Sequence, residues 1–264
     1  MMNRAWWLGG SDGEGGERLW DRGLRFGMSV FETIAVFDGR PLFLEEHLVR
    51  IERASRDLLG VPVAPMTALP LEELATGGET GVLRVYVTAG TGGILEPVTA
   101  PGAFALFERC EIAGGPGAGW RLAIERAPMP VTPGGWKTGN YWANVRARQE
   151  ATARGYDEAV VADPSGAVMG ASMGNLFVVD GGRLMTPPLE TGARPGVVRQ
   201  WVMERTEATE ELLTFETLRG AGEIFITNSR VGLATVSEFD GHPLTANRVA
   251  ASLAAQYCDE ILSR

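Results

Sequence analysis

Lys137 is the only lysine in the sequence, and every other strongly basic residue is an arginine. A lysine amine can form an imine with a carbonyl group, whereas an arginine guanidinium cannot. The residue lies in the turn-prone stretch Trp136-Lys137-Thr138-Gly139-Asn140-Tyr141, just before a predicted helix. Spacing alone favours an ordinary solvated loop residue. A chemical role therefore depends on whether the rest of the chain supplies groups that would act with this amine.

Three other features could together bind an anion. Gly196-Val197-Val198 lies at a predicted helix start, where free backbone N–H groups and the helix dipole favour a phosphate. Thr227-Asn228-Ser229 places hydroxyl groups just past a predicted strand, and Arg50 could add a fork of donors. Each feature alone is more often a cap, a turn or a surface charge. With the single lysine, they predict a phosphorylated aldehyde cofactor that is held by its phosphate and joined as an imine.

The N-terminal half contains the elements that would position Arg50. Strands are predicted over Ser29 to Phe37, Val82 to Thr88 and Ala103 to Glu108, with a helix from Leu44 to the stop signal Gly60, a short helix over Leu71 to Ala75 and a hairpin turn at Asp38-Gly39. Arg53 is expected on the solvated face of the longer helix. The glycine cluster Ala89 to Gly93 lacks the Lys-Ser/Thr pair of a phosphate loop and is interpreted as a hairpin loop.

The C-terminal half would carry the lysine and the helix start. The run Gly114 to Gly119 is the predicted linker, which separates domains 1–113 and 120–264. Helices are predicted from Tyr141 to Arg154 with Asn140 as N-cap, from Pro195-Gly196 through Glu204, and from Ala246 to Leu262. Strands are predicted at Arg121 to Ile124, Glu158 to Ala162, Asn175 to Val179, Arg183 to Met185 and Glu223 to Thr227. Both domains therefore mix helices and strands, and the fold class is α/β (α+β).

Composition excludes several classes of function. The net charge of -9 argues against a protein that binds nucleic-acid backbones, which needs a basic face. Two distant cysteines and two histidines give little material for a metal site or a Ser-His-Asp triad. There is no apolar run long enough for a membrane span, and the N-terminus does not resemble a secretory signal. We expect a cytoplasmic protein with no bound metal, and no nucleic-acid or membrane partner.

Several segments resemble the class IV (fold type IV) pyridoxal-phosphate enzymes, which include branched-chain and D-amino-acid aminotransferases and 4-amino-4-deoxychorismate lyase. The segments come in the family's order from about Asp21 to Leu244. They are Asp21-Arg22-Gly23 with Gly27, Phe31-Glu32-Thr33, His47 to Ile51, Lys137 to Tyr141, Gly155 to Ala159, Asn175-Leu176-Phe177, Pro195 to Arg199, and Glu223 to Ser229.

The resemblance implies roles for particular residues. Lys137 would form the Schiff base with pyridoxal 5'-phosphate, and Tyr141 would hydrogen-bond the phenolic oxygen of the cofactor. The phosphate would be held by Arg50 and by the turns that contain Gly196, Val197, Val198, Asn228 and Ser229. The resemblance also implies a small N-terminal domain, a larger C-terminal domain, a cofactor between them, and a homodimer.

One position departs from the family pattern in a way that matters chemically. The family has a glutamate five positions before the Asn of Asn175-Leu176-Phe177, where it keeps the pyridine nitrogen protonated. Here the position is Gly170. Loss of a charge-assisted bond worth about 1.5–3 kcal/mol would lower the pKa of the ring nitrogen and weaken the cofactor as an electron sink. In addition, the loop Gly90 to Leu95 has no arginine, whereas some family members use one near there for a substrate carboxylate.

Three hypotheses follow. The first is an aminotransferase that moves an amino group between an amino acid and a 2-oxo acid, with Lys137 as the general base. The second is a lyase of the aminodeoxychorismate type that releases pyruvate, in which aromatisation lowers the demand on the electron sink. The third is a catalytically impaired relative that binds the cofactor, or a relative without it, as Gly170 would allow.

Overall fold

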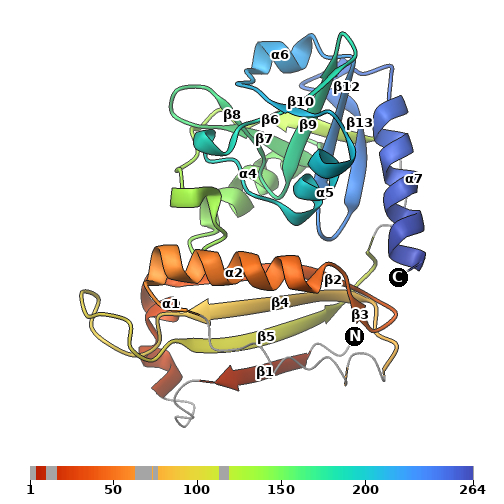
Figure 1. Ribbon diagram of the computed structural model, residues 1–264. Coiled ribbons are helices and arrows are strands. Elements are labelled where there is room, and N and C mark those ends of the chain that lie inside the picture. The colour runs from red at the N-terminus through yellow and green to blue at the C-terminus, as the bar shows by residue number, and fades with distance from the viewer. Residues whose placement is uncertain (1–3, 10–16, 63–72, 74–76, 113–118, 264) are drawn as a thin grey trace. The chain divides into compact units, whose positions relative to one another are not determined.

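The chain forms two compact units in the computed structural model, which describes residues 4–9, 17–62, 73, 77–112 and 119–263 (Figure 1). Unit 1 comprises Met1–Ile112 with Trp136–Asn140, and unit 2 comprises Ala113–Gly135 with Tyr141–Arg264. The segment Trp136–Asn140 thus groups with unit 1, although the sequence places it beyond the predicted linker. Most of that linker, 114–118, and most of the short helix expected at 71–75 lie outside the described residues.

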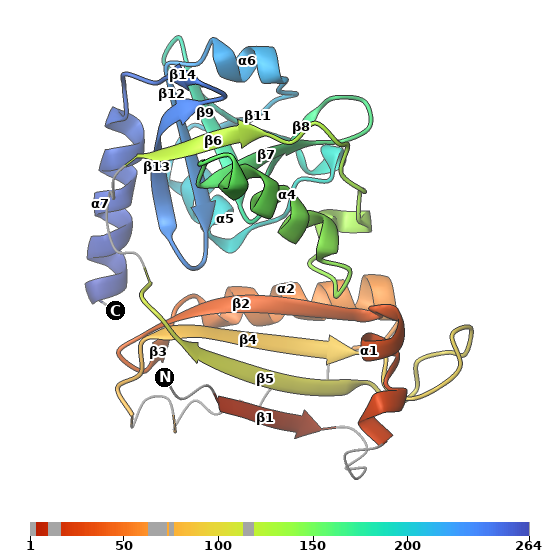
Figure 2. The same cartoon turned by 180° about the vertical axis from the view of Figure 1, so that it is seen from behind.

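Unit 1 is an antiparallel sheet with one long helix. Its strands have the order β1-β5-β4-β2-β3, and Figure 2 shows the four longer ones side by side with the helix behind them. The elements are β1 (Arg4–Gly9), η1 (Glu17–Trp20), α1 (Arg22–Phe26), β2 (Ser29–Phe37), β3 (Arg40–Pro41), α2 (Leu44–Leu59), β4 (Gly81–Thr88) and β5 (Gly102–Arg109). The strands and the long helix predicted here are confirmed. Alternating apolar residues on β2, β4 and β5 pack with α2, which explains why these patterns were strong.

The predicted hairpin turn and the predicted helix end in unit 1 are also confirmed. Asp38 and Gly39 both have positive φ, 47° and 77°, as a two-residue hairpin turn requires. Gly60 ends α2 with φ of 73° in the left-handed region. Arg53 is exposed, as expected.

Unit 2 is a larger mixed sheet with helices packed against it. Its main strand order is β11-β10-β9-β12-β13-β6-β7-β8, and β14 pairs with β13. The strands are β6 (Trp120–Ile124), β7 (Glu158–Ala162), β8 (Val168–Ala171), β9 (Asn175–Asp180), β10 (Arg183–Thr186), β11 (Thr209–Glu210), β12 (Glu223–Asn228), β13 (Gly232–Phe239) and β14 (His242–Pro243). The helices are η3 (Pro133–Gly135), α4 (Trp142–Ala153), η4 (Leu189–Thr191), α5 (Val197–Arg205), α6 (Phe215–Arg219) and α7 (Arg248–Ser263). Helix α4 contacts β6 and β7, whereas α5 and α7 contact β12 (Figures 1 and 2).

The structure corrects two helix starts. Tyr141, not Asn140, is the N-cap of α4, and it makes no side-chain capping bond. Asn140 instead packs against Gly27, where a Cβ would come within 2.2 Å of Asn140 Oδ1. Pro195 precedes the N-cap Gly196 and so lies outside the helix that it was predicted to open. Strands β1, β8, β11, β13 and β14 and helix α6 are not among the predicted elements.

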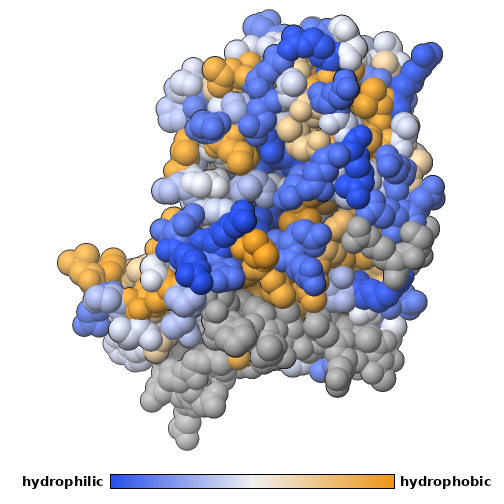
Figure 3. Space-filling view, in the orientation of Figure 1, coloured by the Kyte–Doolittle hydropathy of each residue, from blue (hydrophilic) through white to orange (hydrophobic). Residues whose placement is uncertain are grey.

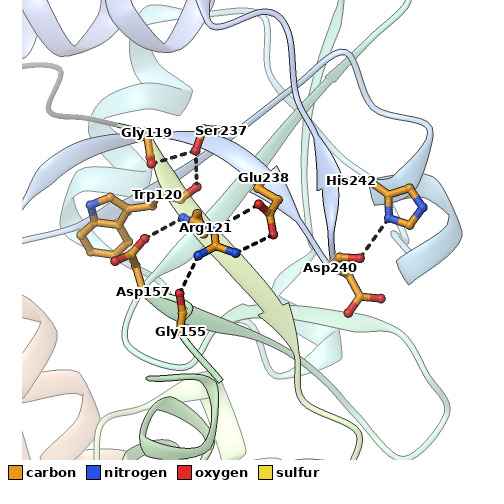
Figure 4. Close-up of polar contacts among 9 residues, drawn as sticks. All are labelled: Gly119, Trp120, Arg121, Gly155, Asp157, Ser237, Glu238, Asp240 and His242. Atoms are coloured by element: carbon orange, nitrogen blue, oxygen red, sulfur yellow. Dashed lines mark hydrogen bonds and ion pairs between the residues drawn. The ribbon is translucent and has the colours of Figure 1, made fainter. Parts of the chain in front are cut away.

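A polar cluster ties β6 to β7 and β13 at the surface of unit 2. Figure 4 shows Arg121 at its centre, with its guanidinium on both carboxylate oxygens of Glu238 and on the Gly155 carbonyl. The Arg121 N–H donates to Asp157 at 2.8 Å. The charged groups in this cluster partner one another, so we assign it a structural role.

Candidate active site

Lys137 is held on the edge of β2 by its own backbone. The Phe31 N–H donates to the Lys137 carbonyl at 3.1 Å, and the Gly139 N–H donates to the Ser29 carbonyl at 3.0 Å. Between these bonds, Thr138 forms an antiparallel bridge with Val30. The segment therefore behaves as a short extra strand, and the lysine is carried by a sheet rather than by a loose loop.

The Lys137 side chain lies beside an aromatic row. Its Nζ is 5.4 Å from the centroid of the Phe31 ring, which is 7 % exposed. Phe31 stacks on Tyr86 at 5.3 Å, and Tyr86 stacks on Phe104 at 4.6 Å, because the three residues are register partners across β2, β4 and β5. This row gives the amine one apolar side and a flat aromatic surface next to it.

Glu32, the residue after Phe31, organises a buried charged group. Its carboxylate accepts from Arg50 Nε at 2.6 Å and also from Arg50 Nη2, and it lies 2.8 Å from His47 Nδ1. Burial alone would raise the pKa of Glu32, but the Arg50 charge and the bonds from both partners outweigh it and hold the pKa well below its usual range. Glu32 is therefore a buried carboxylate that remains charged.

His47 remains neutral in this group. Burial lowers its pKa first of all, and the charges of Arg50 and Lys137 lower it further, against the opposing effect of Glu32. The structure thus brings Lys137 and Arg50 to the same part of unit 1. Two nitrogens of Arg50 donate to Glu32, which fixes the orientation of the guanidinium, and the Arg50 side chain is 11 % exposed. Its expected role as a phosphate donor stays a prediction.

In unit 2, the start of α5 can accept an anion. Gly196 is the N-cap, and the N–H groups of Val197 and Val198 belong to the first turn of this nine-residue helix, where such groups have no partner within the helix. A Cβ on Gly196 would lie 2.0 Å from Asn175 Oδ1. The Asn175 amide in turn donates to the Arg194 carbonyl at 2.7 Å. Asn175, for which the sequence analysis predicted no role, therefore holds the loop that leads into this helix.

The turn after β12 lies in the same unit, and α5 contacts β12. Thr227 Oγ1 is buried and, among the described residues, has no hydrogen-bond partner. Asn228 Oδ1 accepts from the N–H groups of Arg230 and Val231, so this side chain shapes the turn. Ser229 is half-buried beside it. Together with the amides of α5, these hydroxyls are a donor set suited to a phosphate group.

Tyr141 has a partner that sequence reasoning missed. Arg194 Nη1 donates to the Tyr141 hydroxyl at 2.7 Å, and the Arg194 Cζ is 4.9 Å from the centroid of the same ring. No local pattern marks Arg194 among the many arginines. Its importance becomes visible only when the fold places the loop before α5 next to the start of α4.

Gly170 lies in β8 and pairs with Val161 of β7. Its φ is +143°, a conformation that residues with side chains rarely adopt. A Cβ there would be 3.0 Å from the Gly174 carbonyl oxygen. The position therefore lacks a carboxylate and has a backbone adapted to glycine.

The sequence model of class IV aminotransferases (Amino-transferase class IV) matches residues 29–239 of this chain. The chain belongs to the class IV aminotransferase family. A putative branched-chain-amino-acid aminotransferase of Methanocaldococcus jannaschii is 31 % identical over 245 residues, which cover 88 % of this chain and 85 % of the relative. The solved 4-amino-4-deoxychorismate lyase of Pseudomonas aeruginosa has a TM-score of 0.82 and 30 % identity over 98 % of this chain and 99 % of that one. A branched-chain aminotransferase of Thermoproteus uzoniensis has a TM-score of 0.81 and 27 % identity, over 98 % of this chain and 94 % of that one.

These findings confirm the expected family, the mixed α/β fold of type IV and an enzymatic role. The family's cofactor, pyridoxal 5'-phosphate, is the cofactor of this enzyme. The residues present fit it, since the amides at the start of α5 and the buried Thr227 hydroxyl suit a phosphate and the one lysine of the sequence can form an imine. The position expected to face the ring nitrogen is the exception, because Gly170 offers no acceptor side chain.

Proposed function

We propose that this protein is an aminotransferase that transfers an amino group between an amino acid and a 2-oxo acid, with Lys137 as the residue that attaches the cofactor. The observation that carries the proposal is the position of the sole lysine, which is fixed by backbone pairing to β2 and lies beside the aromatic row. When bound, pyridoxal 5'-phosphate withdraws electrons from the bond that loses its proton. An uncharged lysine amine at this place can take up that proton and return it.

The remaining site residues would bind and orient the cofactor. We assign the amides of Val197 and Val198 and the hydroxyl of Ser229 to the phosphate, with Gly196 leaving room for its approach. Asn228 acts by shaping the turn that carries Ser229. Arg50 would add a charge that Glu32 keeps in place.

Tyr141 would donate its hydroxyl proton to the phenolic oxygen of the cofactor. The direction of this bond follows from its partner. A guanidinium has no acceptor, so the Tyr141 oxygen must accept from Arg194 and must donate its own proton elsewhere.

A lyase that releases pyruvate is the second candidate. Two observations favour it: the similarity to an aminodeoxychorismate lyase over almost the whole of both chains, and Gly170, which lowers the expected strength of the electron sink. A catalytically impaired relative that binds the cofactor is the third, because Gly170 replaces the glutamate expected at the ring nitrogen. Conversion of the bound cofactor to its pyridoxamine form by an amino acid would support the aminotransferase. Pyruvate release from aminodeoxychorismate without such conversion would support the lyase.

The decisive experiment uses the single lysine. Borohydride treatment of the protein loaded with cofactor should add the cofactor's mass to one peptide, that of Lys137. The variant Lys137→Arg keeps the charge but cannot form an imine, so it should lose both the added mass and the visible absorbance band. An unmodified Lys137 peptide in the wild-type protein, or equal labelling of both proteins, would overturn the assignment.

We also propose a homodimer. Unit 1 exposes large apolar side chains on η1, α1 and the loop between β4 and β5, namely Leu19, Trp20, Leu24, Ile94 and Leu95. Figure 3 shows hydrophobic atoms on the part of this loop that extends from the unit. Such surface is typical of an interface between subunits. The variant Leu95→Glu should shift the mass measured by light scattering toward the monomer. The exposed Leu212→Glu in unit 2, a matched control, should leave that mass unchanged.

We place the enzyme in the cytoplasm. Both cysteines, Cys110 and Cys258, are free, which fits a reducing compartment. Of the helices described, none is long and apolar enough to cross a membrane. Fractionation of cells that produce the protein with its own termini would test the location.

A further inference from the structure

Arg194 lies in the loop that leads into α5, and its backbone is fixed there. Its carbonyl accepts from the Asn175 side-chain amide at 2.7 Å and from the Gly196 N–H at 2.8 Å. The backbone of Arg194 therefore has a fixed position, two residues before the N-cap of α5. The side chain reaches the Tyr141 hydroxyl at 2.7 Å and is half-buried.

In the described part of the chain, the guanidinium of Arg194 has no carboxylate partner. Among the described residues, its only hydrogen-bond partner is the Tyr141 hydroxyl, and no acidic side chain lies within ion-pair distance of it. The other arginines of unit 2 that are buried or half-buried differ in this respect. Arg199 pairs with Glu210, and Arg148 pairs with Glu158. A half-buried cation with unused N–H donors is a site for an anion.

We propose that Arg194 binds the carboxylate of the substrate and that Tyr141 orients it for this role. This inference rests on the proposed function, in which both the amino acid and the 2-oxo acid carry a carboxylate next to the reacting carbon. The planar fork of a guanidinium matches a carboxylate with two parallel hydrogen bonds. The Tyr141 hydroxyl uses one nitrogen, and the guanidinium carbon lies 4.9 Å from the centroid of the same ring, so Tyr141 contacts the guanidinium twice and leaves its other nitrogens available.

The alternative anion is the cofactor phosphate, since Arg194 is close in sequence to α5. We favour the carboxylate because Tyr141, the partner of Arg194, is the residue assigned to the phenolic oxygen, and that oxygen neighbours the reactive aldehyde carbon in pyridoxal phosphate. In addition, the loop Gly90 to Leu95 offers no arginine for this purpose. The two anions give different results in the following test.

The test measures binding by the cofactor-loaded protein of an unreactive carboxylate, 4-methylvalerate, and of its uncharged amide. Arg194→Met should raise the Kd of the carboxylate roughly tenfold or more, because a charge-assisted bidentate contact is lost, and should change the Kd of the amide less than about twofold. Arg194→Lys, which keeps the charge, should recover part of the loss. Arg126→Met, an exposed arginine of the same unit, is the matched control for one lost charge and should change neither constant.

Each other outcome overturns the inference. An equal change for carboxylate and amide would mean a structural role for Arg194. A weaker affinity for pyridoxal phosphate or inorganic phosphate, with the carboxylate Kd unchanged, would mean that Arg194 binds the phosphate. Failure of the proposed function itself is seen separately, because borohydride would then attach no cofactor to Lys137 in the wild-type protein, whatever the state of Arg194.

Discussion

The side-chain amide of Asn175 donates to the carbonyl oxygen of Arg194 at 2.7 Å and so joins β9 to the loop before α5. The other atom of the same group, Oδ1, would lie 2.0 Å from a Cβ at position 196. One asparagine therefore fixes the loop and also requires glycine at the N-cap. Both effects act on the helix start to which we assign the cofactor phosphate.

Gly196→Ala should accordingly weaken cofactor binding. The added methyl group must displace Asn175 or the first turn of α5, at a cost of about 1–3 kcal/mol in the free energy of unfolding. We expect the Kd of pyridoxal phosphate to rise by about tenfold or more, as measured by fluorescence quenching. Gly220→Ala is the control, because its Cβ would meet only ordinary contacts at 3.8 Å. An equal rise in the Kd of pyridoxal phosphate in the two variants would contradict the proposed close contact between position 196 and Asn175.

Glu32→Gln should destabilise unit 1 strongly. The change leaves Arg50 and His47 without their shared carboxylate in a buried place, and loss of one member of such a group costs about 3–5 kcal/mol. Urea unfolding measures the difference. Glu52→Gln removes an exposed carboxylate paired with Arg56 on α2, and should cost no more than about 1 kcal/mol. Similar losses in both variants would argue against a special role for Glu32.

The stability of the protein should depend on pH through His47. Its pKa is lowered in the folded state, so the unfolded chain binds a proton more readily below its ordinary pKa of about 6.5. The free energy of unfolding of the wild-type protein should therefore decrease as pH falls below that value. In His47→Gln, the dependence of this free energy on pH should be weaker over the same range. Urea titrations between pH 5 and 7.5 test it. His242→Gln, at an exposed position, is the control that should retain the slope.

Glu158 gives a prediction of opposite sign. Burial raises its pKa, while Ser172 and the Ala159 N–H bond one of its oxygens. The folded protein thus holds this proton more tightly than the unfolded chain does, and stability is lost as pH rises above about 4.3. Glu158→Gln cannot titrate, so its stability relative to wild type should increase between pH 5 and 8. Glu150→Gln, an exposed control on α4, should show no such trend.

Restoring a carboxylate by Gly170→Glu should have two separable effects. The positive φ and the 3.0 Å approach to the Gly174 oxygen should destabilise any side chain at this position by about 1–3 kcal/mol. Gly170→Ala carries the same strain without the charge and is the matched control. If ring protonation limits the reaction, exchange of the substrate's α-proton should be faster in Gly170→Glu than in Gly170→Ala. Identical rates would show that another group protonates the ring or that protonation is not limiting.

The sequence predicted the regular elements well where local patterns are strong. Alternation and glycine stops located β2, α2 and β7 because these signals are local. The predicted N-cap of α4, Asn140, was wrong because this side chain packs against Gly27. The two residues are far apart in the sequence, so the contact depends on the fold. Strand β8 was missed because it is short and contains Gly170.

The candidate site was predictable in part. Lys137 could be found because a single lysine is visible in composition. Arg50 could be found by resemblance, but its fixation by Glu32 depends on how α2 packs on β2. The contacts of Arg194 and Asn175 could not be predicted, because they join residues far apart in the chain. The segment Asn175-Leu176-Phe177 matched the family pattern, but that match did not assign a role to its asparagine.

The backbone pairing of Trp136–Asn140 with β2 has a consequence for how the protein can be divided. The chain passes from one unit to the other after Ile112, Gly135 and Asn140, so unit 1 is not a contiguous piece of the gene product. A fragment that ends at Ile112 would lack Lys137 and would leave Ser29–Phe31 as an uncovered strand edge, which favours aggregation. We therefore expect a fragment that ends at Ile112 to need the segment Trp136–Asn140, supplied as a peptide, to complete unit 1.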